Sequence, residues 1–229
     1  MHAPIGNLSD PLERILQERR SVRGFLPDPV DPAFLNRVFT MAQQAPSNCN
    51  VQPWVVHVVS GVAADRMRDI LHDAASAQTE PSPDFPLTGA YPGHYRARQI
   101  DAAKALFAAT GVARDDVEAR KESFLRNFRF FDAPHAAFLF LPNWAGIREA
   151  ADCGMFAQSF MLALTANGLA SCAQGALGHH ADLVRRELGV GDDLRLLFGI
   201  AFGYEDIQHP ANVTRTDRCV VADAVQFHQ

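Results

Sequence analysis

The segment Arg19-Arg20-Ser21-Val22-Arg23-Gly24-Phe25 places three guanidinium groups and a hydroxyl within its first five residues. A guanidinium is always charged, and its fork of N–H donors matches phosphate oxygens two at a time. Cations this close together repel one another unless an anion lies among them. The segment therefore points to an anion site. A solvated basic end of a helix is the simpler alternative, since cations favour a helix C-terminus.

Two amphipathic helices are expected on either side of this segment. Ser9-Asp10-Pro11 is a helix-start signal, and the apolar spacing that follows predicts a short helix leading to Arg19. Asp31-Pro32 repeats the signal and predicts a second helix that Pro46 ends.

A turn rich in amide and hydroxyl groups follows the second expected helix. Its sequence is Ala45-Pro46-Ser47-Asn48-Cys49-Asn50-Val51-Gln52-Pro53-Trp54. It leads directly into the β-branched run Val55–Val59, which predicts a buried strand. Such a loop suits hydrogen bonding to a heteroaromatic ring, and ordinary turn chemistry is the alternative.

Apolar periodicity predicts helices and strands along the rest of the chain. Helices are expected at about 62–78, 96–109, 114–128, 147–167 and 180–188, and strands at about 136–141, 169–176 and 194–202. The helix at 147–167 is apolar nearly all round, which predicts burial in the core or against a second subunit. The apolar last segment, from residue 205, is expected to dock as an added strand or helix end.

Composition limits the class of protein. The 229 residues are 48% hydrophobic and 21% charged, as in a folded globular domain, and no linker divides them. A net charge of −5 argues against nucleic acid as a partner. The four cysteines form no C-x-x-C pair, so we expect reduced thiols in a cytoplasmic protein and no metal site. No apolar run is long enough to span a membrane.

Two motifs together carry a resemblance to a known family. They are Arg19-Arg20-Ser21-x-Arg23-x-Phe25 and Ala45-Pro46-Ser47-x-x-Asn50-x-Gln52-Pro53-Trp54. Their content, order and separation resemble the nitroreductase family of FMN-dependent oxidoreductases. The resemblance implies an α+β fold, with a central, mainly antiparallel sheet flanked by helices, in an intertwined homodimer. It also implies a single FMN-binding domain over residues 1–229, with a variable lid-like segment at about 80–130.

The resemblance gives the first motif a role at both ends of the flavin. It implies that Arg19 and Ser21 hold the phosphate, with Arg20 alongside. It places Arg23 beside N1–C2=O of the isoalloxazine ring, where negative charge gathers on reduction and a cation stabilises the reduced form.

Three further segments match the family's flavin site. Four residues of the turn match the loop that reaches the flavin from the partner subunit: Pro46, Ser47, Asn48 and Asn50. Gln174 and Gly175 match the loop whose main chain approaches flavin N5. Arg215 and Arg218 fall where the family places a final basic pair at the phosphate, and the choice between them stays open. A solvated tail is the alternative for this pair.

The middle third of the chain carries no motif, and Glu80–Gly93 holds four prolines that exclude a helix or a central strand. In the family the corresponding segment covers the active site. Its aromatic residues are therefore candidate substrate contacts, with aromatic packing inside a lid as the alternative: Phe85, Tyr91, His94, Tyr95, Phe124 and Phe128.

The resemblance implies hydride transfer from NADH or NADPH, through FMN, to a nitroaromatic or quinone acceptor by a ping-pong mechanism. The absence of a G-x-G-x-x-G motif after a strand fits a nicotinamide without its own domain. Alternatives are a flavin-dependent dehydrogenase, a dehalogenase, a flavin-breakdown relative, or a non-catalytic FMN-binding protein. No 2′-phosphate reader can be located in the sequence, so NADH and NADPH are not distinguished.

Overall fold

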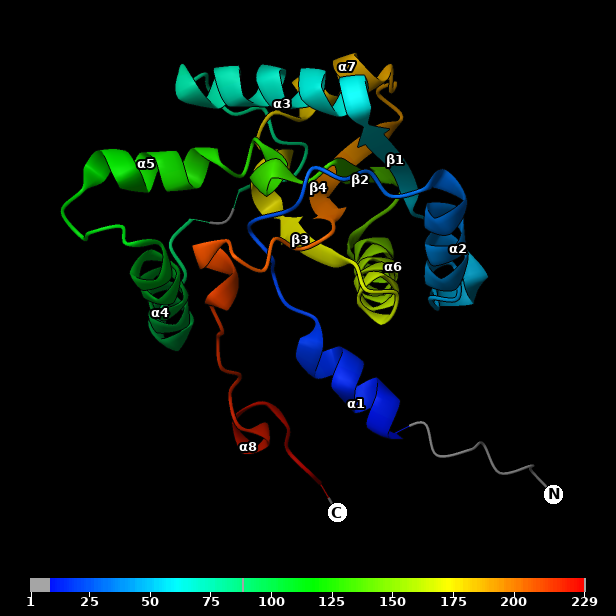
Figure 1. Ribbon diagram of the computed structural model, residues 1–229. Helices are drawn as coiled ribbons and strands as arrows, with labels where there is room; N and C mark the ends of the chain where they lie inside the picture. The colour runs from blue at the N-terminus through cyan, green and yellow to red at the C-terminus, as the bar shows by residue number, and fades with distance from the viewer. Residues whose placement is uncertain (1–8, 88, 229) are drawn as a thin grey trace.

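Helices and strands alternate along the chain much as apolar periodicity predicts. The computed structural model describes residues 9–87 and 89–228 (Figure 1). Its helices are α1 Ser9–Glu18, α2 Pro32–Ala42, α3 Gly61–Ser76, α4 Gly93–Thr110, α5 Val117–Leu125, α6 Ile147–Ala166, α7 Ala181–Leu188 and α8 Val221–Ala224. Its strands are β1 Val55–Ser60, β2 His135–Pro142, β3 Ala170–Gln174 and β4 Leu194–Gly203.

The four strands form one sheet in the order β1-β2-β4-β3, with each neighbouring pair antiparallel. The α+β class with a mainly antiparallel sheet is thereby confirmed. Strand β2 is central, and its side chains alternate between two hydrophobic cores. Phe138 and Phe140 enter one core, while Leu139 and Leu141 enter the other. A strand covered on both faces reads as a continuous apolar run, which is how the sequence reveals it.

Helices cover both faces of the sheet (Figure 1). Helices α3 and α7 pack on one face, through residues such as Met67 and Val184. Helices α2 and α6 pack together on the other face, where the Phe39 ring stacks on Phe160 with centroids 4.5 Å apart. Helices α4 and α5 project from one side of this sandwich and line no part of either core except through Leu125 at the end of α5.

Two expectations concern burial. Helix α6 is buried on one side within the chain, and its other side is open, with Ile147 88% and Met155 39% exposed, so burial of that side against a second subunit stays a prediction. The last segment is docked only over its first part, where Glu205 bridges to Phe25 and Asn212 is buried. Residues 215–228 are all exposed in the single chain, and α8 is a single turn, so the expected docking is absent there. In this exposed part, Val220 and Phe227 are 66% and 83% exposed among the described residues.

Two helices are shorter than predicted. Helix α2 ends at Ala42, four residues before Pro46. Helix α5 covers 117–125 instead of 114–128, because Asp116 caps its start and left-handed backbone from Phe130 to Asp132 follows its end. Within residues 9–87 and 89–228, every helix is too short or too polar to cross a lipid bilayer.

Candidate functional site

The arginine-rich segment lies along the free edge of the sheet. Strand β3 is an edge strand, and Ser21 forms a parallel bridge with Ser171 on it. The main-chain N–H of Val22 donates to the carbonyl of Ser171 at 3.1 Å, which satisfies part of the edge. Gln174 lies three residues further along β3, about 10 Å at the rise of a strand. The pairing therefore brings two predicted parts of the site, Arg19–Arg23 and Gln174-Gly175, to one edge.

A buried asparagine that the sequence did not single out fixes the main chain at Arg23. The Asn212 Oδ1 atom accepts from the N–H of Arg23 at 2.7 Å, and its Nδ2 donates to the carbonyl of Gly24 at 2.8 Å. Asn212 is only 5% exposed. Gly24 is required here, because a Cβ would lie 2.2 Å from the His209 ring. No local signal could identify this role of Asn212, since Arg23 and Gly24 are almost 190 residues away in the sequence.

The three arginines of the segment have different surroundings. Arg20 forms an ion pair with Glu205, so its charge is met within the chain. Arg23 reaches the carbonyl of Ser21 at 3.3 Å, and its guanidinium lies 5.9 Å from the Phe131 ring centroid. Arg19 is half-buried, and its side chain forms no hydrogen bond or ion pair with a described residue. Arg19 is therefore the cation of this segment with free capacity for an anion.

A second cation from the end of the chain lies near Arg19. Burial lowers the pKa of Arg19, and the positive charge of Arg218 lowers that pKa further. Two guanidinium groups that destabilise each other in this way favour a bound anion between them. Both arginines also donate to nearby main chain: Arg215 to the carbonyls of Asn212 at 2.8 Å and Thr214 at 3.0 Å, and Arg218 to those of Thr216 at 3.0 Å and Asp217 at 3.2 Å. The effect of the Arg218 charge on Arg19 is what favours Arg218 over Arg215 as the companion of Arg19.

A buried thiol lies underneath this group of residues. Burial raises the pKa of the Cys172 thiol, while Arg23, a hydrogen bond from Ser21 and Arg19 act in the opposite direction. Arg19, Ser21 and Arg23 thus all act on the Cys172 thiol of strand β3.

The turn that contains Pro46, Ser47, Asn48 and Asn50 is exposed or half-exposed and conformationally strained. Its backbone is left-handed at Cys49, Asn50 and Gln52, with φ of 49°, 58° and 50°. Non-glycine residues keep such a conformation only where their surroundings hold it, often at ligand sites. Ser47 supplies one constraint, since its Oγ accepts from the N–H of Gln52 at 2.9 Å. The turn lies against α6, and in this chain it faces outward.

Gln174 at the end of β3 is held on one side only. Its Nε2 donates to the Asn127 carbonyl at 2.9 Å, while its Oε1 is buried and has no hydrogen-bond partner among the described residues. The adjacent Gly175 is exposed, with open space where a Cβ would stand. Asn127, which fixes Gln174, is a further residue that the sequence did not indicate.

The six aromatic candidates for substrate contact divide into two groups. Phe128 is 1% exposed and belongs to a hydrophobic core, and Phe85 packs below the Arg195 guanidinium at 4.6 Å. Phe128 is therefore covered by core packing in this conformation, whereas Phe85 is half-exposed. The other four lie at the surface of the segment: Tyr91, His94, Tyr95 and Phe124.

The available groups fit FMN. Arg19 and Arg218 suit a phosphate, because each guanidinium can give charge-assisted hydrogen bonds to its oxygens. The unpartnered Gln174 Oε1 suits the polar edge of a ring, because a buried acceptor without a donor costs free energy. A ligand with a phosphate at one end and a polar ring at the other would bind the free cations and also give the Gln174 Oε1 atom a hydrogen-bond partner.

Comparison with known proteins identifies close relatives. The profile of the Nitroreductase family matches residues 16–204. The chain is 42% identical to nitroreductase NfnB of Mycolicibacterium smegmatis, over 98% of this chain and 95% of NfnB. It is 31% identical to the nitrobenzene nitroreductase of Ectopseudomonas oleovorans, over 88% and 89% of the two chains. The crystal structure of the FMN-dependent NfnB from Mycobacterium smegmatis with NADPH superposes with a TM-score of 0.92, covering 97% of this chain and 100% of that one.

Proposed function

The chain belongs to the nitroreductase family, and from that premise we propose that it is an FMN-dependent enzyme that reduces nitroaromatic compounds with NADPH or NADH. One observation carries the proposal. The Arg19–Arg23 segment is paired to β3, so that a free, half-buried guanidinium and the orphaned Gln174 Oε1 lie along one sheet edge. Relatives named as FMN- and NADPH-dependent or nitrobenzene-reducing enzymes support the same activity.

The residues present divide the work of holding the cofactor. Arg19, Ser21 and Arg218 would bind the phosphate, with Arg20 held back by Glu205 as a structural support. Arg23, fixed by Asn212, would present its positive charge to the pyrimidine side of the ring. Gln174 and the Gly175 main chain would meet the ring from the end of β3. Bound FMN would supply the two-electron chemistry between nicotinamide and acceptor.

We extend the proposal to a homodimer in which the turn at Pro46–Asn50 completes the partner's site. The support is the exposure of apolar side chains on the single chain: Trp144 at 67%, Ile147 at 88% and Phe227 at 83%. Exposed apolar surface of this kind marks interaction sites. Sedimentation of the purified protein should give twice the chain mass of 25.1 kDa.

We also place a lid-like segment at about 80–130 within the single FMN-binding domain. Its start is anchored, because the Asp84 carboxylate accepts from the N–H of Leu196 at 2.6 Å and pairs with Arg185. Helix α4 beyond it has no buried residue, so little packing within the chain resists its movement.

Spectroscopy and steady-state kinetics test the proposal. The purified protein should be yellow with FMN, be bleached by NADPH or NADH without oxygen, and regain colour with nitrobenzene. The proposal includes quinones as further electron acceptors. It also includes a ping-pong kinetic order, which would give parallel double-reciprocal plots, and a cytoplasmic location for the protein. Failure of both nucleotides to bleach the flavin would favour a dehydrogenase, dehalogenase, flavin-breakdown or non-catalytic FMN-binding relative.

A further inference from the structure

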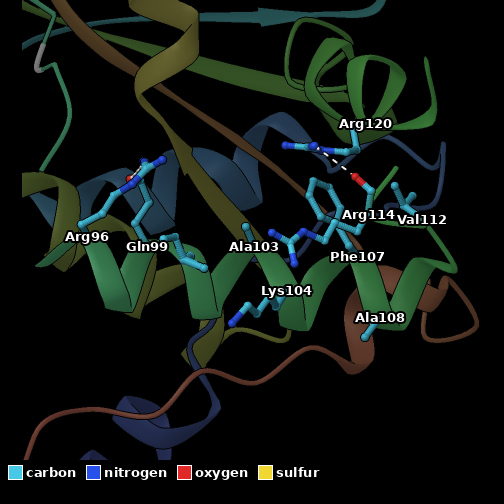
Figure 2. A pocket seen from close by; sticks show the side chains of 10 residues that line it. Arg96, Gln99, Ala103, Lys104, Phe107, Ala108, Val112, Arg114 and Arg120 are labelled. Carbon is cyan, nitrogen blue, oxygen red and sulfur yellow. Dashed lines mark hydrogen bonds between the residues drawn. The ribbon is translucent and has the colours of Figure 1, made fainter. Parts of the chain in front are cut away.

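A cavity of about 830 Å³ lies between α4 and α5, within the lid-like segment (Figure 2). This volume is in the range of ligand sites. Its lining combines long cationic side chains with one aromatic ring and small apolar residues: Arg96, Gln99, Ile100, Ala103, Lys104, Phe107, Ala108, Val112, Arg114 and Arg120. None of the flavin-site residues named above lines it.

The lining holds four cations and no acidic side chain. Among described residues, Arg96, Arg114 and Arg120 form no ion pair, and Lys104 has only Asp101, one helical turn away at 3.6 Å. Two acids at the start of α5 have partners of their own, since Asp116 caps the helix and Glu118 faces Lys121. Four like charges around one cavity repel one another, so the cavity is electrostatically suited to a multiply charged anion.

The cavity also offers planar groups that can stack on a ligand. Arg120 lies across it, donating from Nη1 to the Arg114 carbonyl at 3.2 Å, with its guanidinium 5.8 Å from the Phe107 ring centroid (Figure 2). The guanidinium lies over the Phe107 ring, and a guanidinium plane held on an aromatic ring can in turn stack on a purine base. An anion carried by an aromatic base therefore matches the lining better than an inorganic ion.

The cavity is connected to the proposed flavin site through α5. Asn127, just beyond the end of α5, binds Gln174, and Arg120 lies seven residues earlier. At the rise of a helix this is about 10 Å, less than the length of an extended nicotinamide dinucleotide. A small nitroaromatic that reached the flavin could not also fill this cavity, whereas the adenosine end of a dinucleotide could.

We propose that this cavity binds the 2′-phosphate and adenine of NADPH and so makes the enzyme select NADPH over NADH. The inference rests on the proposed function, because it names which reductant that function uses. The 2′-phosphate carries nearly two negative charges that NADH lacks. Arg114 and Arg120 would bind it, with Arg96 and Lys104 adding long-range attraction. The Phe107 ring would support the base.

The double variant Arg114→Ala/Arg120→Ala tests the cavity, with Lys121→Ala as the control. Lys121 is a neighbouring cation on α5 that does not line the cavity. Stopped-flow reduction of the FMN-loaded protein should show the preference for NADPH over NADH falling about tenfold or more in the double variant. The control should keep the wild-type preference. Since the cavity is open to solvent, the wild-type preference should also shrink at high salt.

A binding measurement separates this inference from the proposed function. Calorimetric titration should give tighter binding of adenosine 2′,5′-bisphosphate than of adenosine 5′-monophosphate, a difference that the double variant loses. If neither NADPH nor NADH reduces the flavin of the wild-type protein, the proposed function is wrong. The titration still tests whether the cavity binds a 2′-phosphate nucleotide. The inference would be overturned if the double variant slowed flavin reduction equally with NADPH and with NADH. It would also be overturned if the variant lost only the reduction of the carboxylated substrate 4-nitrobenzoate. Arg96→Ala repeats the test of nucleotide preference with one substitution. Arg96 lies on α4, which has no buried residue, so this change removes a cation without disturbing core packing.

Discussion

The buried carboxylate of Asp152 accepts a hydrogen bond of 3.1 Å from the main-chain N–H of Asn48. Asp152 lies on α6 and is 4% exposed, whereas Asn48 begins the strained part of the turn proposed to reach the partner's flavin. This bond therefore connects the long central helix to the turn. It gives Asp152 a positioning role that its place in the sequence did not indicate.

Replacing Asp152 with alanine should loosen the turn and weaken FMN retention about tenfold, because a hydrogen bond to a charged group contributes about 1.5–3 kcal/mol. Asp152→Asn keeps an acceptor oxygen and should retain most of the affinity. Gln158→Ala, an exposed change on the same helix, is the control. Fluorescence titration of the FMN-free protein measures all three. Equal affinity in Asp152→Ala and Asp152→Asn would contradict the positioning role.

Arg19 and Arg23 should have separable effects on the flavin. Arg19→Ala removes the cation without a protein partner and should weaken FMN retention more than it slows flavin reduction. Arg23→Ala should do the reverse, since the proposal places this charge beside the ring, where reduction adds negative charge. Dialysis of bound FMN and anaerobic stopped-flow reduction provide the two measurements. Equal effects of both variants on both quantities would show that the roles are wrongly assigned.

His135 should make the fold sensitive to acid. Burial lowers the pKa of His135 below its usual 6.5, and the charge of Arg68 lowers it further. Its Nε2 accepts from the N–H of Val30 at 2.9 Å, so a proton on Nε2 would break that bond. The folded state then binds fewer protons than the unfolded state, and stability rises with pH in this range.

Stability from His135 is therefore present above about pH 6.5 and lost as the pH falls through the lowered native pKa. Thermal melts between about pH 7 and pH 5.5 should show this fall. His135→Gln offers a neutral acceptor to Val30 and should flatten part of the slope. Some slope should remain, because burial also lowers the pKa of His179, His180 and His209. An unchanged slope in the variant would exclude His135 as a contributor.

Asp31→Ala should destabilise the fold by about 1 kcal/mol through loss of a helix cap. The Asp31 Oδ1 atom accepts from the N–H of Ala33 at 2.8 Å and of Phe34 at 3.1 Å, at the start of α2. Asp28→Ala, an exposed acid outside any helix, should leave the unfolding midpoint in urea nearly unchanged. A similar shift in the two variants would mean that net charge, and not capping, sets the effect.

Much of the fold follows from local pattern because the sheet is buried on both faces. The run at β2 alternates between two apolar cores, so it reads as a strand from its composition alone. The helix start at Asp31 was likewise visible, because capping is a contact between near neighbours, and α1 begins at the predicted Ser9. The end of α5 was not visible, because left-handed backbone at Phe130 and Phe131 depends on the surrounding core and not on their own propensity.

The candidate site divides in the same way. The motifs around Arg19 and Ser47 are contiguous, so they could be recognised as a pair. The residues that hold these motifs in place could not be recognised, since Asn212 and Asp152 each lie more than 100 residues from the main chain that they bind. The cations of the α4–α5 cavity are also scattered in the sequence, and only helix packing gathers them.

By itself the sequence determined most element types, because periodicity, capping and charge are properties of neighbours along the chain. Two contiguous motifs also predicted the family by resemblance and supplied candidate residues for a phosphate and a ring. Only the tertiary structure decided which arginine is free, which amide and carboxylate hold the site, and where four cations surround a cavity. Those outcomes depend on contacts between distant segments. Such contacts form only when the hydrophobic cores bring those segments together.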